Sequence, residues 1–343
     1  LFIVMYLLAF TLLYLGIVKK YEPLLLIPIA FGVLIANFPG GGMGVLQADS
    51  DGMVEFMKNG VMVKKDIYSM PLHEIAHDLG LMNYLYYALI KSGLLPPIIF
   101  MGVGALTDFG PMLRNLKLAV FGAGAQFGIF AVLLVASQFF TLQEAGSLAI
   151  IGGADGPTAI FTTLKLAPHL LAPIAIAAYS YMALVPVIIP LVVKLTCSKK
   201  ELMINMKEQD KLYPSKTEFK NMRALKIIFP IAVTTIVAII VPDAVSLVGM
   251  LMFGNLIKEI GANTSRLFET ASNGIMNAAT IFLGLSVGAT MTVDAFLNFQ
   301  TLGIVAGGFL AFGFSIFGGI LLVKVMNLFS KKKINPLVGA TGL

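Results

Sequence analysis

Long apolar runs are the feature that most constrains this chain. Of its 343 residues, 58% are hydrophobic and only 12% are charged, whereas soluble domains carry about 25% charged residues. A water-soluble globule of this size could not bury so much apolar surface, so the sequence predicts an all-α polytopic membrane protein. A bilayer-spanning helix needs about 20 apolar residues. The candidate spans are 1–18, 23–38, 84–104, 117–140, 168–193, 224–242, 244–260, 274–291 and 301–328.

The placement of lysine and arginine predicts the orientation of these spans. Residues 194–223 hold eight basic residues against four acids, and cytoplasmic loops carry such an excess. We therefore expect a basic cytoplasmic loop at 195–222, with Lys19, Lys20 and the lysines at 331–333 also inside. Glu144 and Asp243 mark outer turns. Because the net charge of +6 is concentrated at helix ends and in this loop, no nucleic-acid partner is expected.

Three pairs of segments recur in the same order in the two halves of the chain. FGVLI (31–35) matches FGNLI (253–257), IFMGVGA (99–105) matches IFLGLSVGA (281–289), and IIGGADG (150–156) matches PLVGATG (336–342). They predict a first repeat over 1–194, with a polar insert at about 41–80, and a second repeat over 223–343. The first turn of the first repeat carries Lys19 and Lys20 and is expected inside, whereas the matching turn of the second repeat carries Asp243 and is expected outside. The two repeats should therefore be inverted relative to one another.

Inverted repeats with broken helices are typical of alternating-access transporters, in which a mobile core moves against a scaffold. The alternative is a duplicated membrane protein that transports nothing. The chain begins at Leu1 and stops at Leu343 inside a repeated segment. We therefore expect it to be incomplete at both ends, with the last part of the second repeat missing.

Two Gly-rich stretches, 145–165 and 335–343, are predicted to be re-entrant or broken helices. In GGADGPT (152–158) the glycines permit unusual dihedrals and Pro157 suits the first turn of a new helix. Asp155 then lies at a helix break inside the membrane, where ionisable residues are usually functional. Na⁺ prefers oxygen ligands, so Asp155, Asn335 and the carbonyls around Gly339 are the predicted sodium site. The alternative is that Asp155 only caps a helix.

Four further polar residues are weaker candidates for the functional site. Asp108, in TDFGP, fits either a helix cap or a functional acid. Tyr179 and Tyr181 lie inside an apolar span and need partners for their hydroxyls; each is either a core residue or part of an ion or proton path. Ser286, in IFLGLSVGA, is a weaker sodium ligand candidate.

His73-Glu74-Ile75-Ala76-His77 matches the HExxH pattern of zinc proteases, which places two imidazoles on one helix face with a glutamate as base. Asn83 occupies the position where the extended pattern has its third ligand, and the only other histidine is His169. An amphipathic surface helix with solvated charges is therefore favoured, and no zinc is expected. Cys197 is the single cysteine, which excludes a disulfide framework.

The ordered strings KKYEPLLLIPIAFG, IFMGVGALTDFGPML, GAGAQFGIFA, IGGADGPTAIF, AAYSYMALVP, VGMLMFGNLI and INPLVG resemble the β subunit of sodium-pumping biotin-dependent decarboxylases. The resemblance covers almost the whole chain. It implies a subunit that receives carboxybiotin from a biotin carrier, releases CO₂ with proton uptake and exports Na⁺. It also implies that Asp155, Tyr179 and Tyr181 take part in catalysis, and that Asn335 and Gly339 belong to the second cluster of the sodium site.

The same resemblance implies the setting of the chain: a homo-oligomer in the bacterial inner (cytoplasmic) membrane, with a carboxyltransferase subunit and a small membrane subunit as further partners. The insert looks shorter than in members that act on oxaloacetate, which favours an acyl-CoA substrate. Two alternatives stay open, a Na⁺-coupled solute symporter without biotin chemistry and a membrane zinc metalloprotease.

Overall fold

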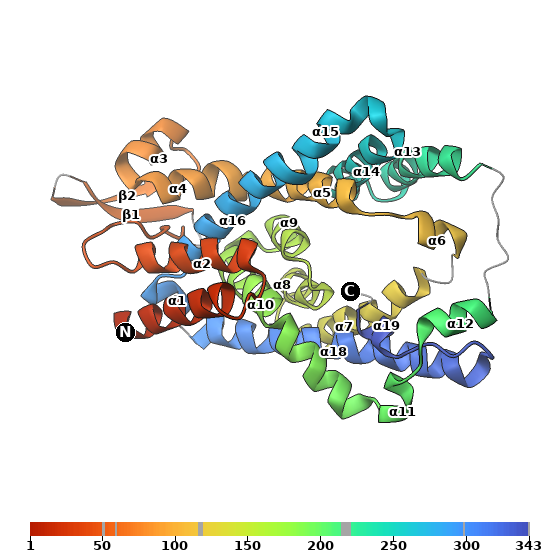
Figure 1. Ribbon diagram of the computed structural model, residues 1–343. Helices are drawn as coiled ribbons and strands as arrows, with labels where there is room; N and C mark the ends of the chain where they lie inside the picture. Colours follow the sequence, from red (N-terminus) through yellow and green to blue (C-terminus); the bar gives the residue numbers. More distant parts are fainter. Residues whose placement is uncertain (50–51, 59, 116–118, 214–220, 298, 342–343) are drawn as a thin grey trace.

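The computed structural model describes residues 1–49, 52–58, 60–115, 119–213, 221–297 and 299–341. Most of the described chain is helical, and its one sheet has two strands. The predicted all-α polytopic membrane fold is therefore confirmed. In Figure 1 the long helices run along one axis of the molecule, with the polar insert at one end and the helices of the basic loop at the other.

The first half of the chain contains two helices, the insert and a series of broken helices. Its elements are α1 (Phe2–Ile17), α2 (Pro23–Ala36), β1 (Met53–Lys58), β2 (Val61–Asp66), α3 (Leu72–Leu79), α4 (Leu81–Leu85), the π-helix η1 (Tyr86–Lys91), α5 (Leu95–Leu106), α6 (Gly110–Arg114), α7 (Ala119–Ala136), α8 (Leu142–Ala149), the 3-10 helix η3 (Ile150–Gly153), α9 (Gly156–Leu166), the 3-10 turn η4 (Pro168–Leu170) and α10 (Leu171–Thr196).

The second half begins after the basic loop. Its elements are α11 (Lys199–Leu202) and α12 (Met206–Leu212) in that loop, α13 (Met222–Ile240), the 3-10 turn η5 (Pro242–Ala244), α14 (Val245–Ile260), the 3-10 turn η6 (Ala262–Thr264), α15 (Ser265–Glu269), the π-helix η7 (Thr270–Ile275), α16 (Met276–Thr290), α17 (Val293–Phe296), α18 (Phe299–Phe329) and α19 (Leu337–Ala340).

Three described helices, within Ala119–Ala136, Met222–Ile240 and Thr301–Phe329, are long and apolar enough to cross a membrane. Two predicted spans, 84–104 and 168–193, are sharply bent instead of straight. Leu81–Lys91 and Leu95–Leu106 meet at 65°, and Pro168–Tyr181 and Leu184–Thr196 meet at 66°. Gly93 and two prolines account for the first bend and Pro186 for the second, because proline removes a helical hydrogen bond and clashes with the preceding turn.

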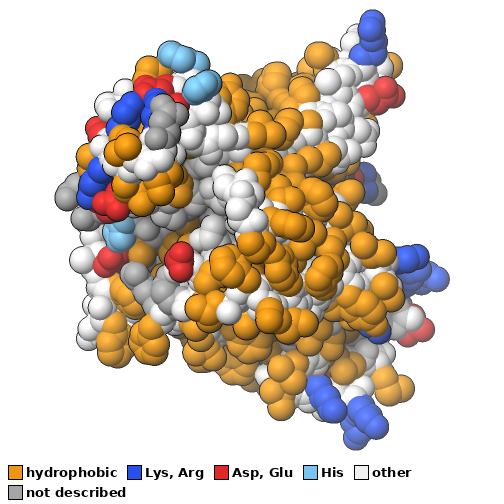
Figure 2. Space-filling view, turned by 90° about the vertical axis from the view of Figure 1, so that its left-hand side faces the viewer, with side chains coloured by type: hydrophobic (Ala, Val, Ile, Leu, Met, Phe, Trp, Pro, Cys, Tyr) orange, Lys and Arg blue, Asp and Glu red, His pale blue; other side chains and the backbone are white. Residues whose placement is uncertain are grey.

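The surface of the molecule is largely apolar. Large exposed hydrophobic side chains occur along α1, α7, α13 and α18, which is the surface that lipid would cover. Figure 2 shows hydrophobic side chains over most of one face, with charged side chains toward its two opposite edges and the histidines at one of them. A soluble protein rarely exposes so large a contiguous apolar surface.

Helices of the two halves pack on one another in two corresponding pairs. Gly32 of α2 lies against the backbone of α16 at Gly288, and Gly254 of α14 lies against the backbone of α5 near Gly104. A Cβ on any of these four glycines would collide with backbone of the facing helix. Because the sequence match aligns α2 with α14 and α5 with α16, both contacts join equivalent segments. Two repeats related by a two-fold axis would pack in this way.

The polar insert folds as an antiparallel hairpin followed by a short helix. β1 and β2 pair from Met53 opposite Asp66 to Lys58 opposite Val61. Val54, Phe56 and Ile75 turn inward and join the core formed by α2, α5 and α16. The predicted polar segment is thus a packed cap on one end of the helices (Figure 1).

Candidate functional site: a broken helix at Asp155

The predicted break at 152–158 is present. α8 ends at Ala149, η3 follows, and α9 begins at Gly156 with Pro157 in its first turn. Ala154 between them has φ +54°, a left-handed conformation that is uncommon for a residue with a Cβ. Such strain is maintained only where the surroundings enforce it, and it concentrates at functional sites. Because the dihedrals leave the helical region and Pro157 has no N–H, the break frees backbone carbonyls from the helical ladder.

Asp155 is the residue immediately before α9 and is only partly exposed. Its Oδ2 accepts a hydrogen bond from the Thr158 hydroxyl. Among the described residues it forms no ion pair. The carboxylate therefore keeps oxygen lone pairs that a cation or a proton could use.

Tyr179 of α10 lies directly against this break. A Cβ on Gly156 would be 2.5 Å from the Tyr179 ring and 2.9 Å from its hydroxyl oxygen. The side chain is 2% exposed, and its hydroxyl has no hydrogen-bond partner among the described residues. An unpaired buried hydroxyl is costly. The structure thus brings together the predicted acid and one predicted tyrosine, which come from different helices.

Tyr181 faces the other way. Its ring packs against Gly308 of α18, where a Cβ would approach within 2.7 Å, and lies 6.0 Å from the Phe309 ring. Since residues two apart point to different sides of a helix, α10 presents Tyr179 to α9 and Tyr181 to α18. Tyr181 therefore lies against the helix that also contacts the break.

Ser315 is a residue that the sequence analysis missed. It is fully buried where α7 crosses α18, between Gly128 of α7 and Gly152 of η3. A Cβ on Gly152 would lie 2.9 Å from its hydroxyl oxygen, which has no hydrogen-bond partner among the described residues. The only available signal was a lone hydroxyl in the apolar string FGFSIFGG. Its position next to the break makes it a further candidate oxygen ligand.

The second predicted cluster lies one helical turn further along α18. Gly339 of α19 packs against the Gly319 backbone. The Asn335 amide donates to the carbonyls of Leu202 and Ile204 at 3.0 and 3.1 Å, and its Oδ1 accepts from Leu337 N at 3.0 Å. No hydrogen bond joins Asn335 to Asp155 in the described part of the chain. The two breaks thus pack on neighbouring turns of α18, while Asn335 as a sodium ligand stays a prediction.

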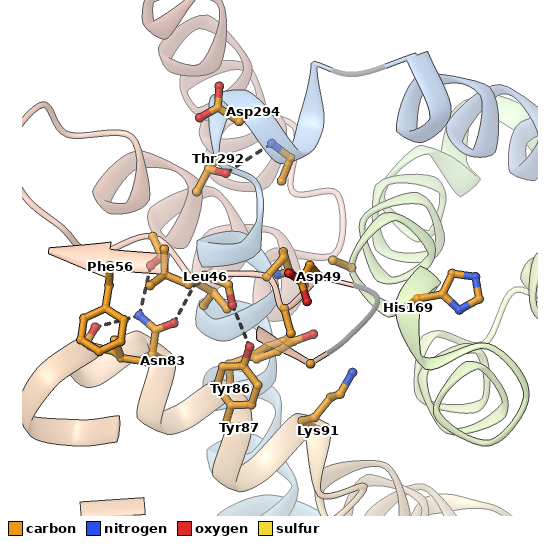
Figure 3. Close-up of a pocket in the computed structure, with 18 of the residues that line it drawn as sticks. Leu46, Asp49, Phe56, Asn83, Tyr86, Tyr87, Lys91, His169, Thr292 and Asp294 are labelled. Carbon is orange, nitrogen blue, oxygen red and sulfur yellow. Dashed lines mark hydrogen bonds between the residues drawn. The ribbon is translucent and has the colours of Figure 1, made fainter. Parts of the chain in front are cut away.

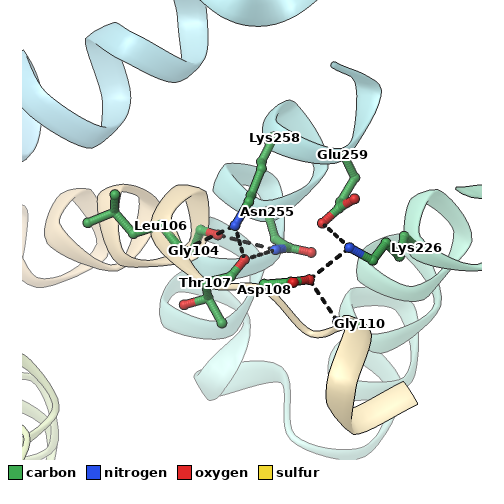
Figure 4. Close-up of polar contacts among 9 residues, drawn as sticks. All are labelled: Gly104, Leu106, Thr107, Asp108, Gly110, Lys226, Asn255, Lys258 and Glu259. Atoms are coloured by element: carbon green, nitrogen blue, oxygen red, sulfur yellow. Dashed lines mark hydrogen bonds and ion pairs between the residues drawn. The ribbon is translucent and has the colours of Figure 1, made fainter. Parts of the chain in front are cut away.

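Asp108 belongs to a separate polar network (Figure 4). Its Oδ1 lies 2.7 Å from Lys226 Nζ and accepts from Gly110 N at 2.9 Å, and Lys226 also lies 3.3 Å from Glu259. The hydrogen bond from Lys226 holds the pKa of Asp108 below its usual value. These contacts favour the structural reading of Asp108. Ser286 is fully buried in α16, and its hydroxyl has no partner among the described residues.

The HEIAH segment forms α3 on the insert. Glu74 pairs with Lys65 of β2, and His77 Nδ1 lies 2.9 Å from Asp78. His169 instead lies 2.8 Å from Glu144, at the start of α8. Among the described residues, no three His, Cys, Asp or Glu side chains form a group that could hold a metal ion. These contacts describe a surface helix whose charges are paired.

A pocket of about 1180 Å³ opens beneath the insert (Figure 3). Tyr87 donates to the Leu46 carbonyl at 2.8 Å beside it, and Asn83 accepts from Leu46 N at 2.8 Å. α10 lines it at Pro173 and then runs through buried Ala175 and Ile176 to Tyr179. Neither Asp155 nor Tyr179 lines the pocket.

These features define a membrane-embedded helical protein with interrupted helices around an acid, the arrangement of ion transporters. Comparison with known proteins gives the family. Residues 2–343 match the model of the Na⁺-transporting oxaloacetate decarboxylase beta subunit. The chain is 48% identical over 343 residues to the methylmalonyl-CoA decarboxylase subunit beta of Propionigenium modestum, covering 99% of this chain and 82% of that protein. It is 44% identical over 370 residues to the oxaloacetate decarboxylase beta chain 2 of Salmonella typhi, covering 99% and 83%.

The chain therefore belongs to the family of β subunits of Na⁺-transporting decarboxylases. It is a membrane-spanning decarboxylase subunit, as the sequence resemblance implied.

Proposed function

We propose that this chain decarboxylates carboxybiotin and couples the release of CO₂ to Na⁺ export and proton uptake. The observation that carries the proposal is Asp155, a carboxylate at a helix break with no ion pair among the described residues. A charged acid at the centre of a membrane costs ~3 kcal/mol on insertion scales. Such a group is stable there when a cation or a proton neutralises it.

The proposed sodium site is built from oxygen atoms, because Na⁺ is a hard cation. Asp155 supplies the charge, and the freed carbonyls near it, Asn335 and the Gly339 carbonyl supply neutral ligands. Ser315 is added because its buried hydroxyl lies against Gly152 and has no hydrogen-bond partner in the part of the chain that the structure describes. Asp108 and Ser286 remain weaker candidates.

Na⁺ entering from the cytoplasm would neutralise Asp155 and let the mobile core move past the scaffold. On the outer side Na⁺ leaves and a proton takes its place. After the core returns, that proton is transferred to the biotin nitrogen as the N–CO₂⁻ bond breaks, which yields biotin and CO₂. The Tyr179 hydroxyl beside Asp155, which has no hydrogen-bond partner among the described residues, is suited to relay the proton. Moving one charge against 100 mV costs about 2.3 kcal/mol, and decarboxylation provides the drive.

The two-repeat organisation supports this cycle. We infer that 1–194 and 223–343 are inverted repeats joined by the basic loop at 195–222. The paired packing of α2 with α16 and of α5 with α14 agrees with such a relation. One set of helices would serve as scaffold, and the helices around the two breaks would move.

The organic substrate is proposed to be an acyl-CoA. The alignments with methylmalonyl-CoA decarboxylase subunits of Propionigenium modestum and Veillonella parvula extend over 343 and 341 residues. Those with oxaloacetate decarboxylase chains extend over about 370. The aligned region of this chain thus agrees in length with that of the methylmalonyl-CoA decarboxylase subunits. A separate carboxyltransferase subunit would select the acid, and a biotin carrier would deliver the carboxyl group.

The remaining assignments follow from the same proposal. A small membrane subunit and further copies of this chain complete the complex, in the inner membrane of a bacterium. The reconstituted complex should release CO₂ from a carboxylated biotin carrier only when Na⁺ is present. A plain symporter would instead move a solute without any biotin protein, and a metalloprotease would bind zinc and lose activity on His73→Ala.

The Asp155→Asn variant tests the role of the acid. It should assemble normally yet lose Na⁺-dependent decarboxylation and ²²Na⁺ transport by at least about 100-fold, because an amide can neither bind Na⁺ by charge nor hold the exchanged proton. Asp243→Asn, which changes a carboxylate that is 90% exposed and outside the proposed site, is the control and should retain most activity. Normal Na⁺-stimulated turnover in Asp155→Asn would reject the proposal.

A further inference from the structure

A second cavity, of about 880 Å³, lies between the insert and the helix that follows Asp155. Ile67, Met70, Leu72 and Ile75 form its wall on the insert side, and Phe161 and Leu164 form its wall on α9. Its volume falls in the range that accommodates organic ligands. This groove is distinct from the sodium site, because none of the proposed sodium ligands lines it.

The groove combines these apolar walls with two cations. Lys91 and Lys165 line it, and none of the described Asp or Glu residues does so. Lys91 Nζ donates to the Pro168 carbonyl at 3.2 Å and lies 5.7 Å from the Tyr68 ring, and both residues also line the groove. Lys91, labelled in Figure 3, thus lies at the edge that the groove shares with the neighbouring pocket.

Lys165 of α9 is the second cation at the edge of the groove. Its Nζ lies 6.0 Å from the Phe161 ring and 4.0 Å from Asp243, a carboxylate that is 90% exposed. An ion pair at this distance and exposure is weak. Lys165 therefore keeps most of its capacity to bind an anion. Apolar walls with lysines at their edge match an amphiphile that has an anionic head.

We propose that this groove binds an anionic phospholipid, with its phosphate at Lys91 and Lys165 and an acyl chain along the apolar walls. The location supports a lipid, because the groove lies where the polar insert meets the apolar helices. A lipid there would touch both the insert and α9, the helix that begins beside Asp155. It would thus stabilise the observed position of that helix. This site is independent of the proposed sodium chemistry.

The test uses the complete subunit with its partner subunits, in nanodiscs of phosphatidylcholine alone or with phosphatidylglycerol. Phosphatidylglycerol should raise the melting midpoint of the wild-type protein and remain bound in native mass spectra. Each lysine contributes about a 5-fold gain in affinity, so Lys91→Gln/Lys165→Gln should bind this lipid at least about 10-fold more weakly. Lys199→Gln/Lys200→Gln, exposed at the other end, is the matched control, and Lys91→Arg/Lys165→Arg should retain binding.

Four results would overturn the proposal. One is equal binding of the two lipids, and another is equal loss in the control variant. The third is the same stabilisation by inorganic phosphate in phosphatidylcholine nanodiscs, which would show a simple phosphate site. If only the isolated subunit responded and the assembled complex did not, a partner protein would cover the groove, and the lipid proposal would be wrong.

Discussion

The absence of a side chain at Gly156 allows the contact between the acid-bearing break and α10. Tyr179 occupies the space that a Cβ at this position would need, with its ring 2.5 Å from that point. The backbone next to Asp155 therefore packs directly on the tyrosine. Any side chain here separates the two helices or displaces the ring.

Gly156→Ala should lower the stability of the subunit by about 1–3 kcal/mol, the usual cost of overpacking, and should reduce Na⁺-dependent decarboxylation. Gly153→Ala is the control, because its Cβ would lie 3.4 Å from the end of the Ile129 side chain. Thermal unfolding and turnover of both variants provide the measurement. If the two variants behave alike, the close packing at Gly156 has no importance.

Parts of this site could be predicted from sequence, and parts could not. The break at Asp155 was predictable from the Gly-Gly pair followed by Pro157, although the residue that adopts the left-handed conformation is Ala154 and neither glycine does. The contact of Tyr179 with Gly156 depends on how α9 and α10 pack, which no local pattern encodes. Ser315 was missed for the same reason, since its importance comes from the crossing of α7 with α18.

At the scale of elements, the insert shows how a polar segment is held on an apolar protein. Asp78 at the end of α3 is buried, with 3% of its side chain exposed, and pairs with Lys58 of β1. Lys65 of β2 pairs with Glu74 of the same helix. These ion pairs join the hairpin to the helix. The HExxH motif could not predict these ion pairs, because it describes only the spacing of residues along one helix. It carries no information on the strands that face that helix.

The insert should lose stability in acid. The hydrogen bond from Lys58, followed by that from His77, holds the pKa of Asp78 below its usual value. Its contribution is therefore fully present above the unfolded pKa of about 4 and is lost as the pH falls through the lower folded value. Hydrogen exchange of residues 52–79, corrected for intrinsic rates, should show this loss.

Asp78→Asn should weaken the protection of the insert from hydrogen exchange already at pH 7. It should also make this protection less dependent on pH. Glu55→Gln is the control, since Glu55 lies 3.6 Å from Lys64 and is 61% exposed, and such surface pairs contribute little. Unchanged protection in Asp78→Asn would contradict the role given to this pair.

In the whole molecule, the pairing of helices between the two halves agrees with two repeats of opposite orientation in the membrane. α2 packs on α16 and α14 on α5 through corresponding glycines, as expected of inverted repeats. The fold class followed from hydropathy, whereas the bends at 65° and 66° did not, because a hydropathy window does not register the angle between two half-helices.

Cysteine labelling tests the orientation. In a Cys197→Ser background, Asp243→Cys and His73→Cys should react with an impermeant maleimide added to intact cells, whereas Lys19→Cys should react only after permeabilisation. All three positions are exposed. Labelling of positions 19 and 243 from the same side would exclude the inverted repeat.

In the proposed cycle one carboxyl, that of Asp155, holds Na⁺ and a proton in turn. The most direct measurement is the rate at which a hydrophobic carbodiimide, which attacks protonated carboxyl groups, modifies Asp155 in the purified complex, followed by peptide mass spectrometry. Modification should become faster as the pH falls, and added Na⁺ should protect Asp155. Where the acid is largely protonated, the Na⁺ concentration for half-protection should increase about tenfold for each unit by which the pH falls. Modification of Asp155 at a rate independent of Na⁺ would contradict the proposed cycle.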